Sequence, residues 1–295
     1  TILRKSDDCI VASIQTIRTR WSHLPHDIRL VFIDEAHLLH KDHIRLMEFW
    51  SAIPFIGLSA TPMTRALGRH FETLVRGPSI EQLMHSRSLV GKVIAYSPRH
   101  EAMKKLLATV KVQSGDYVKG DLANALNRKE IIGDLPVEWR KHAGGRQTVV
   151  FAVNIAHSKS IAEDFIAAGI SAAHIDGTMP DEERDKIIAD YRAGRVQVLS
   201  SVAVLAVGFD APETGCVVLA RPTLSEMLHI QQAGRGMRPF DGKEDLIILD
   251  HAGNCVRHGL PQFFEVPDLD DGRRKPKNKR HKKDKTIVCS NCGSV

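Results

Sequence analysis

The stretch that decides the interpretation of this chain is Gln231-Gln232-Ala233-Gly234-Arg235-Gly236-Met237-Arg238. Arg235 and Arg238 lie three positions apart, so on a helix they would share one face. Guanidinium groups suit phosphate, because each presents a planar fork of donors. Gly234 and Gly236 are poor helix formers, which indicates that something approaches the backbone closely here. The alternative interpretation is a solvated basic face.

A second informative segment, Asp34-Glu35-Ala36-His37, follows the apolar run Leu30 to Ile33. A carboxylate at the C-terminal end of a buried parallel strand faces the crevice where α/β sheets bind ligands. In such a place Asp34 could hold magnesium through water, and Glu35 could act as base for an attacking water. The alternative is a helix that merely begins with favourable acidic residues.

Hydroxyl side chains come after the next predicted strand, Phe55 to Leu58, in the segment Ser59-Ala60-Thr61-Pro62. At a strand end, Ser59 and Thr61 could hydrogen-bond His37 or Glu35. Ser and Thr before Pro also form ordinary turns, so this segment gains its meaning from its order after the Asp-Glu pair.

The segment Gly208-Phe209-Asp210-Ala211-Pro212 follows the most apolar predicted strand of the C-terminal half. Gly208 would allow close approach to the backbone, and Asp210 could accept a ribose hydroxyl. An ordinary turn would use the same residues.

Strand-like and helix-like runs alternate along the chain, which predicts an α/β fold with parallel sheets. A length of 295 residues favours two domains. In the first half we expect strands at 8–13, 30–33 and 55–58 and a broken helix over 64–85. In the second half we expect strands at 148–153, 172–175, 196–200, 216–220 and 246–250. Residues 99–141 are not assigned. The expected domains are 1–90 and 91–266, followed by a basic linker, 267–286, and a short end, 287–295.

Positive charge is concentrated near the C-terminus. Between Gly272 and Lys285 there are nine Lys or Arg and one Asp, a balance of +8. The net charge of the chain is +6, so the rest sums to +6 − 8 = −2. A basic block of this kind favours phosphate partners, although it could also serve solubility alone.

Five cysteines in a chain of this length do not indicate a disulfide framework, so a reducing, cytoplasmic location is expected. Cys9, Cys216 and Cys255 lie in or beside apolar runs and are predicted to be core residues. Cys289 and Cys292 have the spacing of half a zinc site, which needs four ligands. No apolar run is long enough to predict a membrane span.

Taken in order, the motifs resemble those of superfamily 2 helicases, and the bacterial and phage DEAD/DEAH-type group related to restriction-enzyme translocase subunits is the most similar. The resemblance covers about residues 8–260 and rests on six segments. They are residues 11–16 (Val-Ala-Ser-Ile-Gln-Thr), 34–37, 59–61, 149–152 (Val-Val-Phe-Ala), 208–212 and 231–238.

The resemblance implies two RecA-like domains with ATP and Mg²⁺ in the cleft between them, the first domain being incomplete here. Its implied roles are magnesium binding and water activation for Asp34 and Glu35, and coupling for His37, Ser59 and Thr61. Gly208 and Asp210 would lie near the ribose, and Gln231, Arg235 and Arg238 near the γ-phosphate. The residues matching strand-contacting motifs are Ser13, Gln15, Thr16, Ser200 and Ser201. The implied partner is nucleic acid, DNA in preference to RNA.

One departure from the family pattern is decisive for activity. Nothing in the chain fits Gly-x-x-x-x-Gly-Lys-Ser/Thr, the loop that cradles the β- and γ-phosphates. The chain is therefore expected to be a fragment that cannot hydrolyse ATP efficiently, of a parent that does. Two other functions remain open. One is a non-catalytic nucleic-acid-binding module that uses the basic tail and the terminal cysteines, with Zn²⁺ bound in a complete parent. The other is a duplex-DNA translocase subunit of a restriction system.

Overall fold

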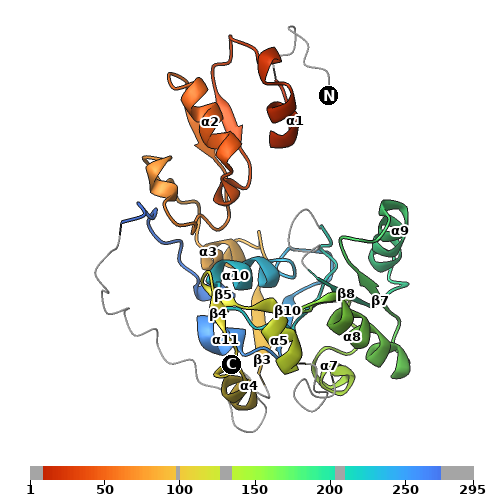
Figure 1. Cartoon of the computed structure of the whole chain (residues 1–295). Helices are drawn as coiled ribbons and strands as arrows, with labels where there is room; N and C mark the ends of the chain where they lie inside the picture. Colours follow the sequence, from red (N-terminus) through yellow and green to blue (C-terminus); the bar gives the residue numbers. More distant parts are fainter. Residues whose placement is uncertain (1–8, 98–99, 127–134, 203–209, 274–295) are drawn as a thin grey trace. The chain divides into compact units, whose positions relative to one another are not determined.

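The computed structural model describes residues 9–97, 100–126, 135–202 and 210–273. These residues form two compact units, one of residues 9–76 with 266–273 and the other of residues within 77–265 (Figure 1). The boundary predicted after residue 90 differs from the one observed after Arg76. The reason is that helix α3 (Ile80–His85) packs Ile80 and Met84 against the core of the second unit.

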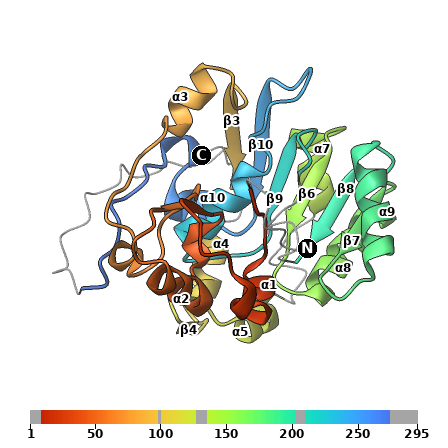
Figure 2. The ribbon, with the colours of Figure 1, turned by 90° about the horizontal axis from the view of Figure 1, so that it is seen from above.

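The second unit is built on a six-stranded sheet whose strands are all parallel. The strand order is β3-β10-β9-β6-β8-β7, which Figure 2 shows from above. The bounds are β3 (Lys92–Tyr96), β6 (Thr148–Phe151), β7 (Ala172–Ile175), β8 (Val198–Ser201), β9 (Cys216–Leu219) and β10 (Asp245–Asp250). The chain thus forms the predicted α/β architecture with a parallel sheet in this unit.

Both faces of this sheet are buried, as parallel sheets require. Alternate residues of each central strand enter different cores. In β9, Val217 and Leu219 pack on one face with helices α3, α9 (Asp181–Arg192), α10 (Glu226–Gly234) and α11 (Asn254–His258). Cys216 and Val218 pack on the other face with α7 (Leu135–Ala143) and α8 (Ile155–Ala167). Continuous apolar strands in the sequence reflect this two-sided burial.

Two helices flank β7 in the chain, and local sequence accounts for their ends. Helix α8 begins at Ile155, because the Asn154 side chain caps it by accepting from the His157 backbone N–H. Gly169 and Gly194 follow α8 and α9 with φ of 75° and 74°, a left-handed conformation that glycine adopts without strain.

Residues 100–126 fill part of the region that the sequence left unassigned. They form α4 (His100–Leu107), the antiparallel hairpin of β4 (Val112–Gln113) and β5 (Asp116–Tyr117), and α5 (Lys119–Leu126). The two helices share a small apolar core of their own, centred on Met103, Leu107, Leu122 and Leu126. At the tip of the hairpin Ser114 and Gly115 both have positive φ, the conformation that a tight two-residue turn needs.

The first unit contains a two-stranded parallel sheet, β1 (Val31–Ile33) and β2 (Phe55–Gly57). Around it lie α1 (Ile14–Thr19) and α2 (Lys41–Phe49). The 3₁₀ helices described in this unit are η1 (Trp21–His23), η2 (Ala36–Leu38) and η3 (Leu67–Arg69). Trp21 contacts the Phe49 ring edge-on at 5.5 Å between centroids, and the Arg45 guanidinium lies 4.1 Å from the Trp21 ring centroid. These contacts tie η1 to α2.

Two expectations for the first half were wrong. The described part of the segment predicted as a strand, residues 9–13, is irregular and leads into α1, which Ser13 caps. Residues 64–85 contain only η3 and α3 rather than one broken helix. Cys9 is exposed, whereas Cys216 and Cys255 are buried as predicted.

Residues 266–273, of which 267–273 were expected to be linker, pack on residues 66–76 of the first unit. The Gly68 N–H donates to the backbone oxygen of Asp270 at 2.8 Å, and the Ala66 N–H donates to the Asp270 carboxylate at 3.0 Å. The Arg69 side chain donates to the Asp271 oxygen, and Arg76 pairs with Asp268. The chain therefore returns to the first unit after completing the second. In the second unit, η5 (Pro261–Phe263) precedes this return.

None of the helices in the described residues has the length and apolar character of a membrane span.

His157 gives a test of the core of the second unit. Its side chain is buried in α8, and this burial lowers its pKa to about 4. Since an unfolded histidine titrates near 6.5, the unfolded state binds more protons between these values. Stability should therefore fall as the pH drops from about 6.5 to about 4. We expect His157→Gln to flatten this part of the profile by up to about 3 kcal/mol.

The measurement is the free energy of unfolding in urea at a series of pH values. The matched control is His85→Gln, at an exposed position in α3, which should keep the wild-type slope. Equal slopes for wild type and His157→Gln would contradict the expectation.

Candidate functional site

The Asp-Glu pair lies at the carboxyl end of β1, as predicted. Glu35 has φ 48° and ψ 46°, a left-handed conformation that costs an ordinary residue about 1–2 kcal/mol. Asp34 stabilises this turn, because its carboxylate accepts from the Glu35 backbone N–H at 2.9 Å. The strained turn changes the direction of the backbone after β1. Glu35 remains half-exposed, whereas Ala36 and His37 are buried. Strain held in this way is common at functional sites.

His37 connects the Asp-Glu segment to the Ser-Ala-Thr segment. Its Nδ1 lies 3.0 Å from Ser59 Oγ and 3.2 Å from Glu35 Oε2. Ser59 Oγ also accepts from the Thr61 backbone N–H at 3.1 Å, and the Thr64 hydroxyl donates to the His37 backbone oxygen. The hydrogen bond between Ser59 and His37, which the sequence suggested, is therefore present. A movement or a change of charge at Glu35 can therefore affect Ser59 through the imidazole of His37.

Asp34 itself is exposed. Within the described ranges, no three His, Cys, Asp or Glu side chains gather closely enough to enclose a metal ion. A single exposed carboxylate fits Mg²⁺, which keeps several of its waters and usually takes only one or two protein carboxylates when it binds with phosphate. The residues present are thus compatible with the predicted magnesium role of Asp34.

In the second unit, α10 carries the segment that opened the sequence analysis. Ser225 caps the helix by accepting from the Leu228 N–H at 3.2 Å, and Gln231 lies half-buried within it. The α-helix ends at Gly234. The sequence analysis placed Arg235 and Arg238 on a helix, but both lie in the tightened turns that follow it. The turn is of the i to i−3 type, with Gly236 N–H donating to the Ala233 oxygen at 3.1 Å.

Asp210 and Arg238 come together, although 28 positions separate them in the sequence. Their side chains form an ion pair. The backbone oxygen of Asp210 also accepts from Arg192 of α9, at 2.6 and 3.1 Å. A phosphate or ribose hydroxyl that binds either Asp210 or Arg238 must compete with their ion pair or join it.

Lys243 is a contributor that the sequence analysis missed. Its ammonium donates to the backbone oxygens of Pro212 and Arg238, each at 2.9 Å. One half-buried cation thereby joins the segment of Asp210 to that of Arg238. Burial lowers the pKa of Lys243 to about 8. No local pattern distinguishes it, because the loop around Gly242 and Lys243 looks like an ordinary polar turn.

Ser200 and Ser201 were expected to contact nucleic acid, but both are fully buried. Ser200 Oγ lies 2.7 Å from Ser158 Oγ of α8. Ser158 Oγ lies 2.7 Å from His174 Nδ1, and His174 Nε2 lies 2.8 Å from the Asp176 carboxylate. The hydroxyl of Ser200 therefore serves packing within the domain here, and its side chain does not reach the surface. Hydrogen bonds from Thr178 and His174 hold the pKa of Asp176 well below its usual range.

Ser13, Gln15 and Thr16 surround the start of α1. Ser13 and Gln15 are exposed and Thr16 is half-buried. The Ser13 hydroxyl caps α1 and lies 3.0 Å from the Thr16 hydroxyl. Their predicted contact with nucleic acid stays a prediction. Gly208, Cys289 and Cys292 lie outside the described residues.

Comparison with known proteins gives the family. Residues 127–239 match the helicase conserved C-terminal domain. A 51.5 kDa protein of a Lactococcus phage (isolate 7-9) is 33% identical over 260 residues, which are 85% of this chain and 55% of that protein. IRC3 of Saccharomyces cerevisiae, provisionally designated an ATP-dependent helicase, is 31% identical over 84% of this chain and 38% of its own length.

Among solved structures, a fragment from Vibrio vulnificus provisionally assigned as the HsdR subunit of a type I restriction enzyme has the same fold. It gives a TM-score of 0.65 at 19% identity, over 88% of this chain and 52% of that one. The second unit is a RecA-like helicase domain with its six-stranded parallel sheet. The chain is of the superfamily 2 helicase type, as its motifs predicted. It spans about half the length of the phage relative and less of the yeast one.

The two glycines of the arginine segment are not equivalent, and this gives a second test. A Cβ at Gly236 would lie 2.4 Å from Leu246 Cδ1 and 2.9 Å from Val217 Cγ2, whereas one at Gly234 would meet nothing within 4 Å. We expect Gly236→Ala to cost about 1–3 kcal/mol through overpacking. Gly234→Ala should be neutral or stabilising, by up to about 1 kcal/mol. The measurement is the free energy of unfolding of both variants in urea, and equal effects would refute the close approach at Gly236.

Proposed function

We propose that this chain is part of an ATP-dependent nucleic-acid helicase or translocase. It would supply the acidic hydrolysis residues of one RecA-like domain and nearly all of the second. The observation that carries the proposal is that His37 Nδ1 lies 3.2 Å from the Glu35 carboxylate and 3.0 Å from the Ser59 hydroxyl. A structural Asp-Glu turn has no need of a buried imidazole that joins its acid to a second loop. A motor needs such a connection, because hydrolysis must be linked to a change elsewhere.

The acidic turn would supply the base for hydrolysis. Glu35 is half-exposed and would accept a proton from the attacking water. Asp34, exposed beside it, would hold Mg²⁺ through water, and the ion would neutralise phosphate charge. Ser59 and Thr61 would respond to the state of Glu35 through His37, so that the loop after β2 reports on hydrolysis.

The arginine segment would stabilise the charge that develops on the phosphoryl group as it transfers. An arginine in this role is worth about 10³ to 10⁵ in rate in related phosphoryl-transfer enzymes. Arg235, Arg238 and Gln231 are the candidates for contacts with the γ-phosphate. Asp210, the ion-pair partner of Arg238, and Gly208 would lie near the ribose. The opening of that ion pair would then accompany binding of the nucleotide.

Nucleic acid is the proposed partner, with DNA preferred to RNA. Aromatic residues make up only 5% of the chain, so platforms for stacking bases are few. Contacts would run mainly to the phosphate backbone, with Ser13, Gln15 and Thr16 at the exposed start of α1. Ser200 and Ser201 would act indirectly, by fixing β8 against α8. The mechanism would alternate between states that differ in affinity for the strand.

The first test is Glu35→Gln, made in the coding sequence extended upstream of Thr1, where a phosphate-binding loop would have to lie. We expect the variant to keep ATP binding and to lose turnover by about 10²-fold or more, because the amide cannot accept the proton. Binding is measured with a fluorescent ATP analogue and turnover by phosphate release with and without single-stranded DNA.

The matched control is Glu48→Gln, an exposed acid on α2, which should leave turnover unchanged. Retained turnover in Glu35→Gln would remove Glu35 from the role of base. Absence of turnover in the extended wild type, with either DNA or RNA present, would overturn the proposed function. Strand displacement compared with triplex displacement separates a helicase from a duplex translocase of the restriction type.

A non-catalytic nucleic-acid-binding module remains the second candidate, favoured by the +8 balance between Gly272 and Lys285. Residues 274–285 of this block lie outside the described residues. If the block binds phosphates, replacing its nine Lys and Arg by Gln should flatten the salt dependence of binding by this chain. Each lost contact removes about 0.7 from the slope of log K against log salt on single strands. Fluorescence anisotropy with a labelled oligonucleotide measures it, and an unchanged slope would place the contacts elsewhere.

A further inference from the structure

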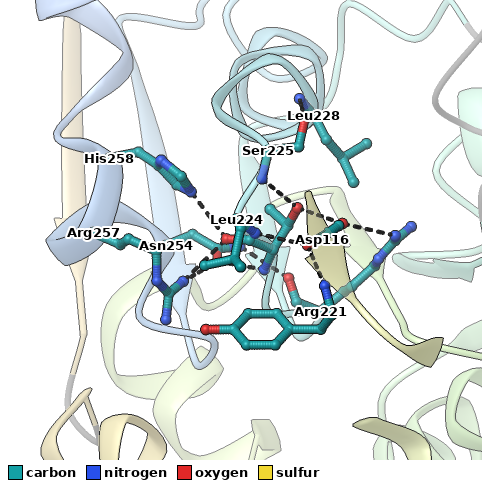
Figure 3. Close-up of polar contacts among 10 residues, drawn as sticks. Asp116, Arg221, Leu224, Ser225, Leu228, Asn254, Arg257 and His258 are labelled. Carbon is teal, nitrogen blue, oxygen red and sulfur yellow. Dashed lines mark hydrogen bonds and ion pairs between the residues drawn. The ribbon is translucent and has the colours of Figure 1, made fainter. Parts of the chain in front are cut away.

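The loop that leads into α10 is held by the β4–β5 hairpin, a segment to which none of the sequence motifs belongs. The hairpin precedes α10 in the chain by more than 100 residues, and Asp116 is its contact residue. The Asp116 carboxylate accepts from the Leu224 backbone N–H at 2.7 Å and from the Thr223 hydroxyl at 2.9 Å. It also pairs with the Arg221 guanidinium at 3.5 Å. Figure 3 shows these contacts converging on one carboxylate.

Asp116 determines where α10 begins. Thr223 is placed by sequence to cap the helix, in a Thr-Leu-Ser-Glu pattern. Its hydroxyl instead donates to Asp116 and accepts from the Ser225 backbone N–H at 3.0 Å. Ser225 therefore becomes the cap, and the helix starts two residues later. A carboxylate from a distant hairpin thus sets the first turn of the helix.

A second clamp holds the same loop from α11. The Asn254 side chain accepts from the Thr223 N–H at 3.1 Å and donates to the Arg221 oxygen at 2.9 Å. His258 contacts the Thr223 backbone oxygen at 2.9 Å, and Arg257 donates to both that oxygen and Asn254 (Figure 3). The start of α11 rests in turn on the buried Asp250 carboxylate, which accepts from the Asn254 and Cys255 N–H groups. The loop is fixed on both sides.

Charge distinguishes the two side chains, Asp116 and Asn254, that accept from backbone N–H groups of this loop. Asn254 is neutral, whereas Asp116 is the carboxylate that faces the largely buried Arg221. Burial lowers the pKa of Arg221 and the charge of Asp116 raises it. Removing Asp116 would leave that cation without its carboxylate partner, which favours withdrawal of the loop toward water. Asn254 cannot replace this interaction.

We propose that Asp116 is a positioning residue: it anchors the start of α10 and thereby sets where Arg235 and Arg238, in the turns that follow the end of this helix, are presented. This inference rests on the proposed function for its consequence in catalysis, but the anchoring itself does not. A helix transmits a shift at its first turn along its length, and misplacement of a catalytic group by about 1 Å can cost about 10²-fold in rate. The β4–β5 hairpin would then control the arginines without touching the substrate.

The anchoring is tested in this chain by hydrogen exchange, followed by mass spectrometry. We expect Asp116→Ala to speed exchange at least tenfold in residues 221–234, with the central strands β6 and β9 remaining protected. Gln113→Ala, at an exposed position opposite Asp116 in the hairpin, is the matched control and should leave exchange as in the wild type. Unchanged exchange over 221–234 in Asp116→Ala would overturn the anchoring, whether or not the protein hydrolyses ATP.

The catalytic consequence is tested in the upstream-extended protein by a double-variant cycle. We expect Asp116→Ala to lower kcat for ATP by about tenfold to a hundredfold, with KM changed less than about twofold. Combined with Arg235→Ala, it should add little further loss, because both changes remove the same contribution. Asp116→Asn, which keeps an acceptor for Leu224, should recover part of the rate. Losses that multiply in the double variant would overturn the positioning role, whereas an inactive wild type would instead refute the proposed function.

Discussion

The constraint on which the second unit depends is that a parallel sheet must be covered on both faces. Each central strand sends alternate side chains into two different cores, so helices have to lie on both sides of the sheet. Because the six strands are parallel, they also begin at one common edge of the sheet. Asp210 and Arg238 are brought together there, because Asp210 precedes β9, Arg238 precedes β10, and these two strands pair. The site is therefore a product of the sheet's order rather than of closeness in sequence.

Within this frame, single charged groups connect segments that carry the motifs. Lys243 joins the backbone of Pro212 to that of Arg238, and Asp116 joins the hairpin to the start of α10. In the first unit His37 has the same kind of function between Glu35 and Ser59. In each case one side chain bonds two loops at once, and the two loops can then move only together.

Much of the architecture could be predicted from local patterns. The strand 172–175 was predicted with its observed bounds, and Gly169 and Gly194 end their helices because glycine adopts positive φ without strain. Prediction failed where a distant partner decided the outcome. Thr223 matches the sequence pattern of a helix cap, but its hydroxyl donates a hydrogen bond to Asp116, 107 positions away. The run 64–85 has helical composition, yet the Ala66 and Gly68 N–H groups donate to Asp270, 204 and 202 positions away, rather than within an α-helix.

The site was predicted unevenly for the same reason. The pairing of His37 with Ser59 followed from residue types and order, because both were placed at adjoining strand ends. Lys243 and Asp116 could not be found, since a polar residue in a turn carries no sign of what it will meet. For Ser200 and Ser201 a motif match gave their place in the chain, but not that the sheet would bury them.

The return of residues 266–273 to the first unit has a mechanical consequence. Within the described residues, the polypeptide crosses from one unit to the other at 76–77 and again at 265–266. With a single connecting segment, the two units could rotate about one backbone bond. Two connecting segments resist such twisting and leave bending as the easier motion. For two bodies that open and close, this doubled connection would act as a hinge.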